Sequence, residues 1–285
     1  MSSITAIILT KNEELNIAKC INSIKPVVER IVVVDSGSSD RTCEIAKELG
    51  AEILVNELVP FLYAKQFLYG MEHADIKTKW VLRIDADEEL TEESAAELSK
   101  ICDKNEETDV NGVVIRFKVN FMGRDLYHGG VYPFKKLLCF KYGKGNIEDR
   151  YMDEHIVLFE GRSVELKSDS LHHDFKDLTY WVNKHNSYST REAQDYYAAI
   201  SDIDSTNASE TGLSKQARVK RFIKYNIYYK LSPGFRTWLY YIYRCVIKGA
   251  FLDGREGRMY AFLQAYWYRY LVDCKIYEMR NDKEV

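Results

Sequence analysis

The chain has 285 residues, of which 46% are hydrophobic and 29% charged, so it can bury the core of one large domain or of a domain with an appendage. Its six cysteines are scattered and form no Cys-x-x-Cys pair, which argues against a zinc ribbon or a disulfide framework and suggests a reducing compartment. Because no basic region precedes the first short apolar run, we expect that run to be a core strand and not a signal peptide.

Charge is unevenly distributed along the chain. Residues 214–285 hold 15 basic and 6 acidic residues, whereas residues 1–213 hold 25 basic and 37 acidic residues. An acidic body followed by a basic tail suggests that the two parts have different tasks.

Apolar runs alternate with helical patterns through the first 121 residues. We expect strands at 4–10, 29–35, 51–55, 79–85 and 112–121, and helices at 13–24, 41–49, 62–74 and 92–102. Asn12 and Asp40 are expected to cap the first two helices. This alternation predicts an α/β fold, with a mostly parallel sheet that carries helices on both faces.

Polar clusters follow three of the expected strands. They read "TKNEE" after the first strand, "DSGSSD" after the second and "DADEE" after the fourth. Ligands of open parallel sheets bind beyond the carboxyl ends of the strands. The three clusters therefore predict a binding site on one rim of the sheet.

The pattern loosens after Gly123. Residues 123–145 mix glycine, aromatic and basic residues and suit a loop-rich binding region, 177–197 look helical, and 201–214 form a polar linker. The tail, Lys215 to Tyr277, is strongly aromatic and has no apolar run long enough to span a bilayer. We interpret the tail as a basic, amphipathic, helical surface that lies on a membrane. The alternative is that the aromatic residues only pack in the protein core, and much of the tail is expected to do so.

The acids at 85–89 raise a question of charge. Asp85 and Asp87 stand two residues apart at a strand end and repel each other unless a positive charge lies near them. A divalent cation, Mg²⁺ or Mn²⁺, would supply that charge and share its ligand shell with substrate phosphates. The alternative is that Asp87, Glu88 and Glu89 only complement the dipole of the next helix.

The motifs "ILTKNEE", "VVVDSGSSDRT" and "RIDADEEL" together resemble the family-2 glycosyltransferases of the GT-A fold, over roughly residues 3–200. The segments "YMDEHIVLFEG" and "WVNKHNSYSTREA" look like the branch that includes bacterial lipopolysaccharide-core and polysaccharide glycosyltransferases. The resemblance implies a catalytic domain at 1–213, with a nucleotide-binding half to about 110 and an acceptor half after it. Residues 214–285 would form the helical tail, which resembles the ends of the same proteins.

The resemblance also implies roles for individual residues of the donor site. Asp35 would contact the uracil or ribose, although this chain has Ser36 where many relatives have a second acid. Asp85 would face the ribose or the metal, and Asp87 would bind the metal. The remaining donor-site residues would be Thr10, Asn12 and Glu13 in the nucleotide pocket and Lys65 near the base and phosphates.

The later motifs supply the expected catalytic base and further contacts. Inverting transfer needs a carboxylate that takes the proton of the acceptor hydroxyl, and the resemblance favours Glu154, with Asp153 second. These acids could instead form a structural ion pair with Arg150 or a nearby basic residue. His172 is a candidate metal or diphosphate contact, and Lys184 a candidate diphosphate partner.

The main hypothesis is a metal-dependent inverting glycosyltransferase with a nucleotide-sugar donor, most simply UDP-linked. Its acceptor would be a glycan or lipid-linked precursor, and we expect a cytoplasmic protein at the inner face of the cell membrane. No nucleic-acid partner is expected, because the acidic body would repel a phosphate backbone. The alternatives are a sugar-phosphate nucleotidyltransferase, which usually carries a Gly-rich loop where this chain reads "TKNEE", and a non-catalytic binding protein of the same fold.

Overall fold

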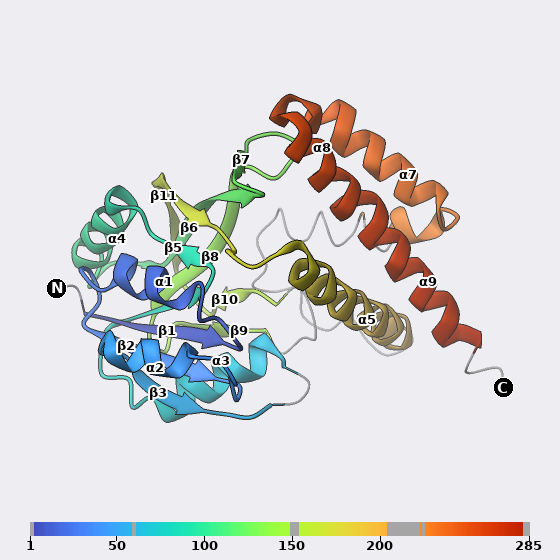
Figure 1. Cartoon of the computed structure of the whole chain (residues 1–285). Helices are drawn as coiled ribbons and strands as arrows, with labels where there is room; N and C mark the ends of the chain where they lie inside the picture. Colours follow the sequence, from blue (N-terminus) through green and yellow to red (C-terminus); the bar gives the residue numbers. More distant parts are fainter. Residues whose placement is uncertain (1–2, 59–60, 149–153, 204–222, 224–225, 282–285) are drawn as a thin grey trace. The chain divides into compact units, whose positions relative to one another are not determined.

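The computed structural model describes residues 3–58, 61–148, 154–203, 223 and 226–281. The chain divides into two compact units, which are described one at a time (Figure 1). The first comprises residues 1–120, 133–149 and 153–175, and the second comprises residues 121–132, 150–152 and 176–285.

The first unit is built on one central sheet with the strand order β3-β2-β1-β4-β8-β6-β11-β5. Pairing is parallel among the first four strands of this order and between β6 and β11, whereas β8 runs antiparallel to both of its neighbours. A separate small sheet pairs β9 (Gly145–Ile147) with β10 (Ile156–Leu158). The strands in this order have the bounds β1 (Ile4–Thr10), β2 (Arg30–Asp35), β3 (Glu52–Val55), β4 (Trp80–Asp85), β5 (Glu88–Glu89), β6 (Val110–Phe121), β8 (Phe134–Lys141) and β11 (Arg162–His172).

Helices cover both faces of this sheet, as the alternation of patterns predicted. Side chains of β1 alternate between two apolar clusters, with Ile8 in one and Ile7 in the other. The first cluster includes α1 (Ile17–Ile24), α2 (Thr42–Glu48) and α4 (Glu92–Lys104), and the second includes α3 (Tyr63–His73). The expected α/β class with a mostly parallel sheet is confirmed.

The first helix begins later than expected because Asn12 has another task. Its backbone is left-handed, with φ 55°, and its side-chain oxygen accepts a hydrogen bond from the backbone N–H of Ser39 at 2.8 Å. Asn12 therefore binds the turn after β2, and α1 begins at Ile17. The expectation that Asn12 caps this helix was wrong. Asp40 does accept from the N–H of Thr42, the first residue of α2, at 3.0 Å.

The expectation of a loop-rich region at 123–145 was also wrong in part. Residues 134–141 form β8, which lies between β4 and β6 in the central sheet. Lys135 and Lys136 break the apolar pattern at the start of this strand, and its last four residues are buried. A strand whose buried half is only four residues long gives little periodicity to read.

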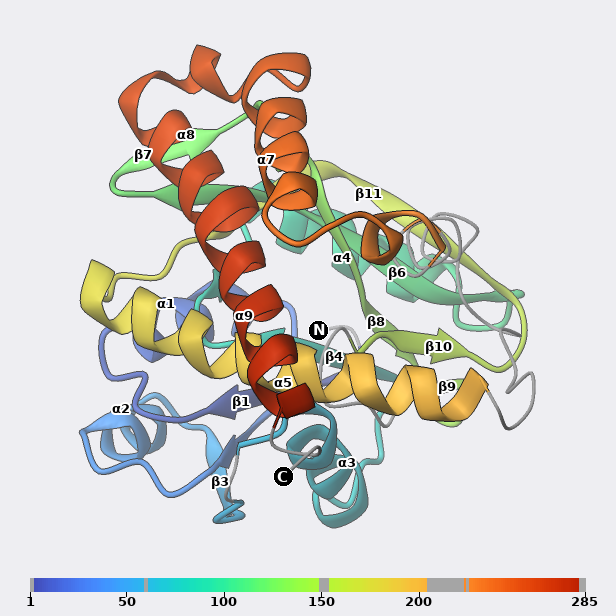
Figure 2. The same ribbon diagram turned by 90° about the vertical axis from the view of Figure 1, so that its right-hand side faces the viewer.

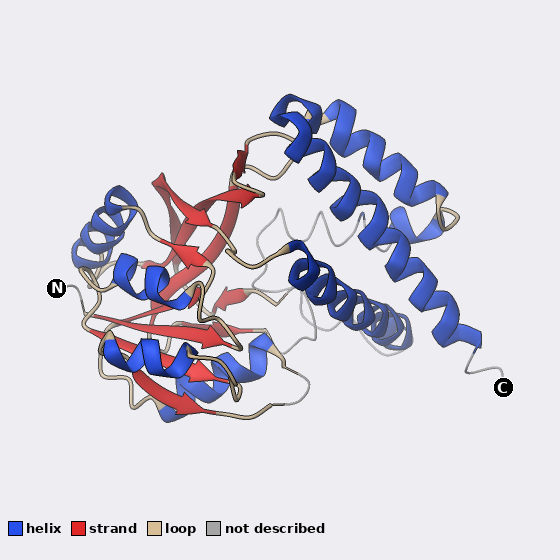
Figure 3. Cartoon of the chain, viewed as in Figure 1, coloured by secondary structure: helices blue, strands red, loops and turns tan. Residues whose placement is uncertain are grey.

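The second unit is largely helical, as Figure 3 shows by colour. Helix α5 (Leu178–Ile203) confirms the helix expected at 177–197 and extends beyond it, and Figure 2 shows it beside α9 (Tyr268–Asn281), against which it packs. The predicted boundary at residue 213 lies outside the described residues. The other elements are β7 (Arg124–Leu126), α7 (Phe235–Ile242), α8 (Gly254–Ala261) and the short helical segments η1 (Tyr228–Lys230), η2 (Tyr243–Ile247), η3 (Ala250–Asp253) and η4 (Phe262–Trp267).

Buried ion pairs hold these helices together. Glu192 of α5 accepts hydrogen bonds from the Tyr268 hydroxyl at 2.7 Å and from the Arg269 guanidinium at 2.6 Å. Arg236 of α7 makes a bidentate pair with the buried Asp273 of α9. In the part of the chain that the structure describes, no helix is sufficiently long and apolar to traverse a bilayer.

We expect Asp273→Ala to lower the free energy of unfolding by about 3–5 kcal/mol, because it leaves the buried Arg236 guanidinium without its counterion. The matched control is Glu278→Ala on the exposed face of the same helix, for which we expect a change within about 0.5 kcal/mol. Urea unfolding of the full chain, followed by circular dichroism, measures both. Equal midpoints for the two variants would show that the buried pair adds nothing to stability.

Candidate active site

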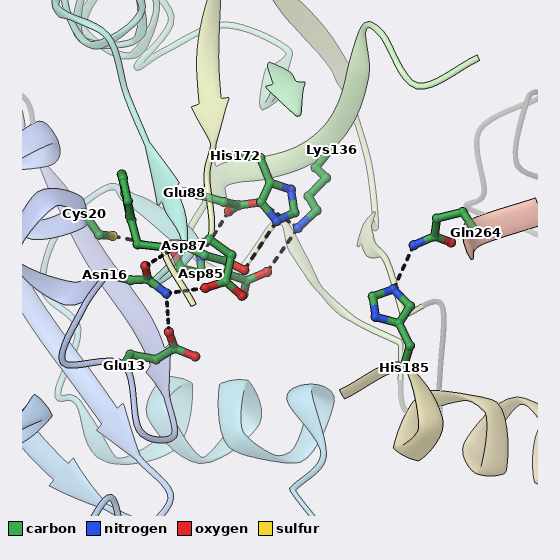
Figure 4. Close-up of polar contacts among 12 residues, drawn as sticks. Glu13, Asn16, Cys20, Asp85, Asp87, Glu88, Lys136, His172, His185 and Gln264 are labelled. Carbon is green, nitrogen blue, oxygen red and sulfur yellow. Dashed lines mark hydrogen bonds and ion pairs between the residues drawn. The ribbon is translucent and has the colours of Figure 1, made fainter. Parts of the chain in front are cut away.

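The acidic segment after β4 folds as a tight turn into β5. The backbone N–H of Asp85 donates to Glu88 Oε2 at 3.0 Å, and the Glu88 side chain is completely buried. Strand β5 pairs antiparallel with β11, which places His172 opposite Glu88. The N–H of His173 donates to the carbonyl oxygen of Asp87 at 2.9 Å. The end of β11 is thus fixed against the acidic turn (Figure 4).

A lysine that the sequence reasoning missed lies between two of these acids. Lys136 Nζ is 3.1 Å from Asp85 Oδ2 and 2.6 Å from Glu88 Oε1. Burial lowers the pKa of Lys136, but the two carboxylates outweigh it and raise that pKa above its ordinary value. Burial raises the pKa of Asp85, yet Lys136 and Arg83 hold it below its usual range. Burial raises the pKa of Glu88. Lys136 therefore supplies part of the positive charge that the sequence analysis assigned to a cation.

Asp87 faces His172 instead of Lys136. Its Oδ2 atom is 3.4 Å from His172 Nε2. Burial lowers the pKa of His172, and the Asp87 carboxylate more than compensates, so that the pKa lies above its ordinary value. Among the described residues, His172 Nδ1 and Asp85 Oδ1 find no hydrogen-bond partner although both atoms are buried.

These residues fit a divalent cation that is held mainly by substrate oxygens. The Asp87 carboxylate is a suitable oxygen ligand for Mn²⁺ or Mg²⁺, the His172 imidazole lies beside it, and Asp85 Oδ1 is a further acceptor nearby. Among the described residues, no group of three or more His, Cys, Asp or Glu side chains is arranged to hold a metal. A cation at Asp87 and His172 would therefore need substrate phosphate or water to complete its shell.

The candidate base, Glu154, is joined to the acidic turn by an arginine of β4. Arg83 lies 3.4 Å from Glu154 Oε1 and 3.6 Å from Asp85 Oδ1, and all three side chains are largely buried. Burial raises the pKa of Glu154, and Arg83 opposes the rise only in part. The pairing expected for a structural role is thus present, but with Arg83. Asp153 and Arg150 lie outside the described residues.

The ends of β1 and β2 form the other side of the predicted rim. The buried Asp35 carboxylate accepts from Thr10 Oγ1 at 2.9 Å and from the N–H of Ser38 at 2.7 Å. The N–H of Asn12 donates to Ser38 Oγ at 2.8 Å. The structure therefore brings Thr10, Asn12 and Asp35 together around one turn, as the motifs predicted.

Asn16 is a second residue that sequence reasoning missed. Its amide nitrogen donates to Glu13 Oε2 at 2.7 Å and to Asp174 Oδ1 at 2.9 Å, and its oxygen accepts from the N–H of Phe175 at 3.0 Å. Figure 4 shows Asn16 next to Glu13. It ties the loop after β1 to the segment that follows His172. The sequence offers no signal for this, because the partners are about 158 residues apart.

Two predicted contacts are not tested by this cluster. Lys65 is exposed on α3, and its approach to a nucleotide stays a prediction. Lys184 belongs to α5 of the second unit, where its ammonium lies 5.9 Å from the centre of the Tyr180 ring. Its neighbour His185, also drawn in Figure 4, bonds Gln264 at 2.8 Å, and burial lowers the pKa of His185 to about 4.

The fold and the site together define an α/β enzyme with an acidic centre at the carboxyl ends of parallel strands. The family model for glycosyl transferase family 2 matches residues 5–160. An uncharacterised glycosyltransferase of Rickettsia typhi is 31% identical over 204 residues, which cover 68% of each chain. The chain belongs to glycosyltransferase family 2, and the expected enzyme class, a glycosyltransferase, is confirmed.

Further relatives extend the match along the chain. A lipopolysaccharide core biosynthesis glycosyltransferase of Rhizobium meliloti is 27% identical over 270 residues, which cover 92% of this chain and 90% of that protein. Among solved structures, glucosyl-3-phosphoglycerate synthase of Mycobacterium tuberculosis, in complex with Mn²⁺, UDP and glucosyl-3-phosphoglycerate, is 22% identical. That match covers 41% of this chain and 44% of the synthase, with a TM-score of 0.33.

We expect Lys136→Ala to destabilise the first unit by about 3–5 kcal/mol, because Asp85 and Glu88 would stay buried without their shared counterion. The neighbouring Lys135 provides a matched control, since its pair with Glu165 is half-exposed and its removal should cost at most about 1 kcal/mol. Thermal unfolding at neutral pH measures both variants. An equal loss for both would mean that the ammonium does not compensate the two acids.

Proposed function

We propose that the protein is an inverting glycosyltransferase that moves a sugar from a nucleotide-sugar donor, UDP-linked in the simplest case, to a glycan or lipid-linked acceptor. The reaction would serve cell-surface polysaccharide or lipopolysaccharide synthesis. One observation carries the proposal: Arg83 joins the buried carboxylate of Glu154 to the acidic turn, where Asp87 faces His172 of β11. The proposed catalytic base and the proposed site for the donor diphosphate thus belong to one network of ion pairs.

The donor would bind along the rim formed by the ends of β1, β2 and β4. Thr10 and Asn12 shape the turn, and the carboxylate of Asp35 is held in place for a base or ribose contact by Ser38 and Thr10. Lys65 and Lys184 remain candidates for the phosphates. The motif match and the polar strand ends support this placement.

Asp87 and His172 would hold a divalent cation, with Asp85 as the nearest further carboxylate. A bound cation of this kind neutralises the negative charge of a departing diphosphate. Lys136 lies beside Asp85 and favours its ionised form, so the Asp85 carboxylate could accept a hydrogen bond from a ribose hydroxyl. Charge at the centre is thus shared between protein cations and a substrate-held ion.

Transfer would proceed by direct displacement at the anomeric carbon. The acceptor oxygen forms the new glycosidic bond, the bond to the nucleoside diphosphate breaks with its electron pair, and Glu154 takes the acceptor proton. A pKa raised by burial makes Glu154 a stronger base than an exposed glutamate. Asp153 is the second candidate for this role.

Relatives and the tail support the proposed acceptor class. The relative of Rhizobium meliloti that aligns over most of this chain is named for lipopolysaccharide core biosynthesis. Its name and the basic, aromatic C-terminal residues support an acceptor at a membrane and a cytoplasmic location at the inner face.

We expect UDP binding to require Mn²⁺ or Mg²⁺ and to be lost or weakened at least about tenfold in Asp87→Ala, since a metal-ligand carboxylate is removed. Isothermal titration calorimetry with and without the metal measures this. Glu93→Ala is the matched control, because it removes an exposed acid from the first turn of α4 and should leave binding unchanged.

Metal-independent UDP binding that survives Asp87→Ala would contradict the cation site. It would support the alternative that Asp87 only complements the start of α4.

We expect Glu154→Gln to lower kcat by about a hundredfold or more while UDP affinity stays within about twofold, because a neutral amide cannot take the acceptor proton. The control is Glu160→Gln, which changes an exposed glutamate a few residues further along the chain. Transfer from a UDP-sugar to a cell-envelope acceptor fraction, with calorimetry of UDP, separates the two effects. Unchanged turnover in Glu154→Gln would transfer the role of base to another group, Asp153 first.

A further inference from the structure

Four large apolar side chains are exposed around one turn of the second unit. Val246 and Ile247 at the end of η2, and Phe251 and Leu252 in η3, have exposed fractions of 53%, 70%, 46% and 56%. We call these four residues the apolar tip. Burying such side chains is favourable by about 1.5–3 kcal/mol each, so their concentration on one turn needs an explanation.

The backbone under the apolar tip is firmly anchored. The buried carboxylate of Asp253 accepts hydrogen bonds from the N–H of Tyr127 at 3.0 Å, from the N–H of His128 at 2.7 Å and from His128 Nδ1 at 2.7 Å. The N–H of Gly129 donates to the carbonyl oxygen of Lys248 at 2.8 Å. The side chains of the tip are therefore held outward by a fixed turn.

Glycines allow this turn to form. Gly249 and Gly254, on either side of η3, have φ of 71° and 73°, where side chains are rarely tolerated. A Cβ at Gly257 would collide with the carbonyl oxygen of Ala250, so α8 can approach η3 this closely only without a side chain. The exposed apolar residues thus stand on a turn that the sequence specifies in detail.

Exposed cations lie close to the apolar tip along the chain. Lys248, Arg255 and Arg258 are exposed, and within the described ranges none of the three pairs with a carboxylate. The acids of the same stretch are occupied, because Asp253 is buried and Glu256 lies 3.7 Å from Arg124. The segment that carries the tip therefore exposes more cations than acids.

Helix α7 adds exposed aromatic and aliphatic residues to the same helical stretch. Phe235, Trp238 and Leu239 are exposed at helical spacing, and Tyr243 follows at the start of η2. Amphipathic aromatic rings and cations next to apolar side chains are typical of proteins that insert shallowly into the lipid headgroup region.

We propose that the apolar tip docks this protein onto an anionic membrane surface, with Val246, Ile247, Phe251 and Leu252 entering the headgroup region and Lys248, Arg255 and Arg258 contacting lipid phosphates. The unpaired cations favour an anionic bilayer over a second copy of the same tip, which would carry the same charge. The inference deepens the proposed function, because a membrane-anchored acceptor requires the enzyme at the lipid surface.

The test is flotation of the full chain with vesicles of phosphatidylcholine, with and without phosphatidylglycerol, in the absence of donor and acceptor. We expect binding to the anionic vesicles, reduced roughly tenfold or more by Ile247→Ser with Phe251→Ser and weakened by added salt. Lys248→Glu with Arg255→Glu should abolish the preference for anionic lipid. The matched control, Val55→Ser with Phe159→Ser, changes two equally exposed apolar residues of the first unit and should bind like the native chain.

Equal binding of the tip variant and the control would overturn the proposal, as would absence of vesicle binding by the native chain. A native dimer that the tip variant converts to a monomer, without vesicle binding, would show that a second copy covers the tip and would also overturn it. Unchanged circular dichroism confirms that the variants fold. UDP calorimetry on the same variants should be unchanged, so failure at the membrane is distinguished from failure of the donor site.

Discussion

The site depends on one buried ammonium group. Strand β8 enters the sheet antiparallel between β4 and β6, and this insertion carries Lys136 to the end of β4. There its charge faces Asp85 and Glu88, two carboxylates that burial alone would drive toward their neutral forms. Glu88 also accepts a hydrogen bond from the backbone N–H of Asp85. By holding Glu88 ionised, the Lys136 ammonium therefore also stabilises the turn that carries Asp87.

This arrangement divides the acids of "DADEE" between two tasks. Glu88 is structural, since it is completely buried and satisfied by Lys136 and by the backbone of Asp85. Asp87 instead meets His172, which the pairing of β11 with β5 brings opposite the turn. The question of charge that the sequence posed thus has one answer in the protein itself: the Lys136 ammonium balances Asp85 and Glu88. For Asp87, a substrate-held ion is our proposal.

Sequence patterns correctly predicted the features that depend on residues close together in the chain, such as strands and polar strand ends. The bounds of β1 match those expected, and the polar strand ends lie together at the rim because parallel strands end at the same edge. Lys136 was missed because a pair of lysines concealed the strand that carries it. Arg83 and Asn16 were missed because each binds a partner far along the chain, Glu154 and Asp174 respectively. The capping role expected of Asn12 failed for the same reason, since a distant turn competes for its side chain.

The basic residues of the C-terminal tail also divide into two groups, one in buried ion pairs and one exposed. Inside the second unit, Arg236 forms an ion pair with Asp273, and Arg269 forms one with Glu192. Burial would make either charge costly without its partner. The count of basic residues in the tail includes these two arginines as well as Lys248 and its exposed neighbours. The count therefore overstates the positive charge that a binding partner could contact, because only cations outside such ion pairs are available to it. In the second unit these include Lys248 and Arg255, which lie near exposed apolar side chains in the chain, and this combination is the basis of the proposed docking to an anionic lipid surface.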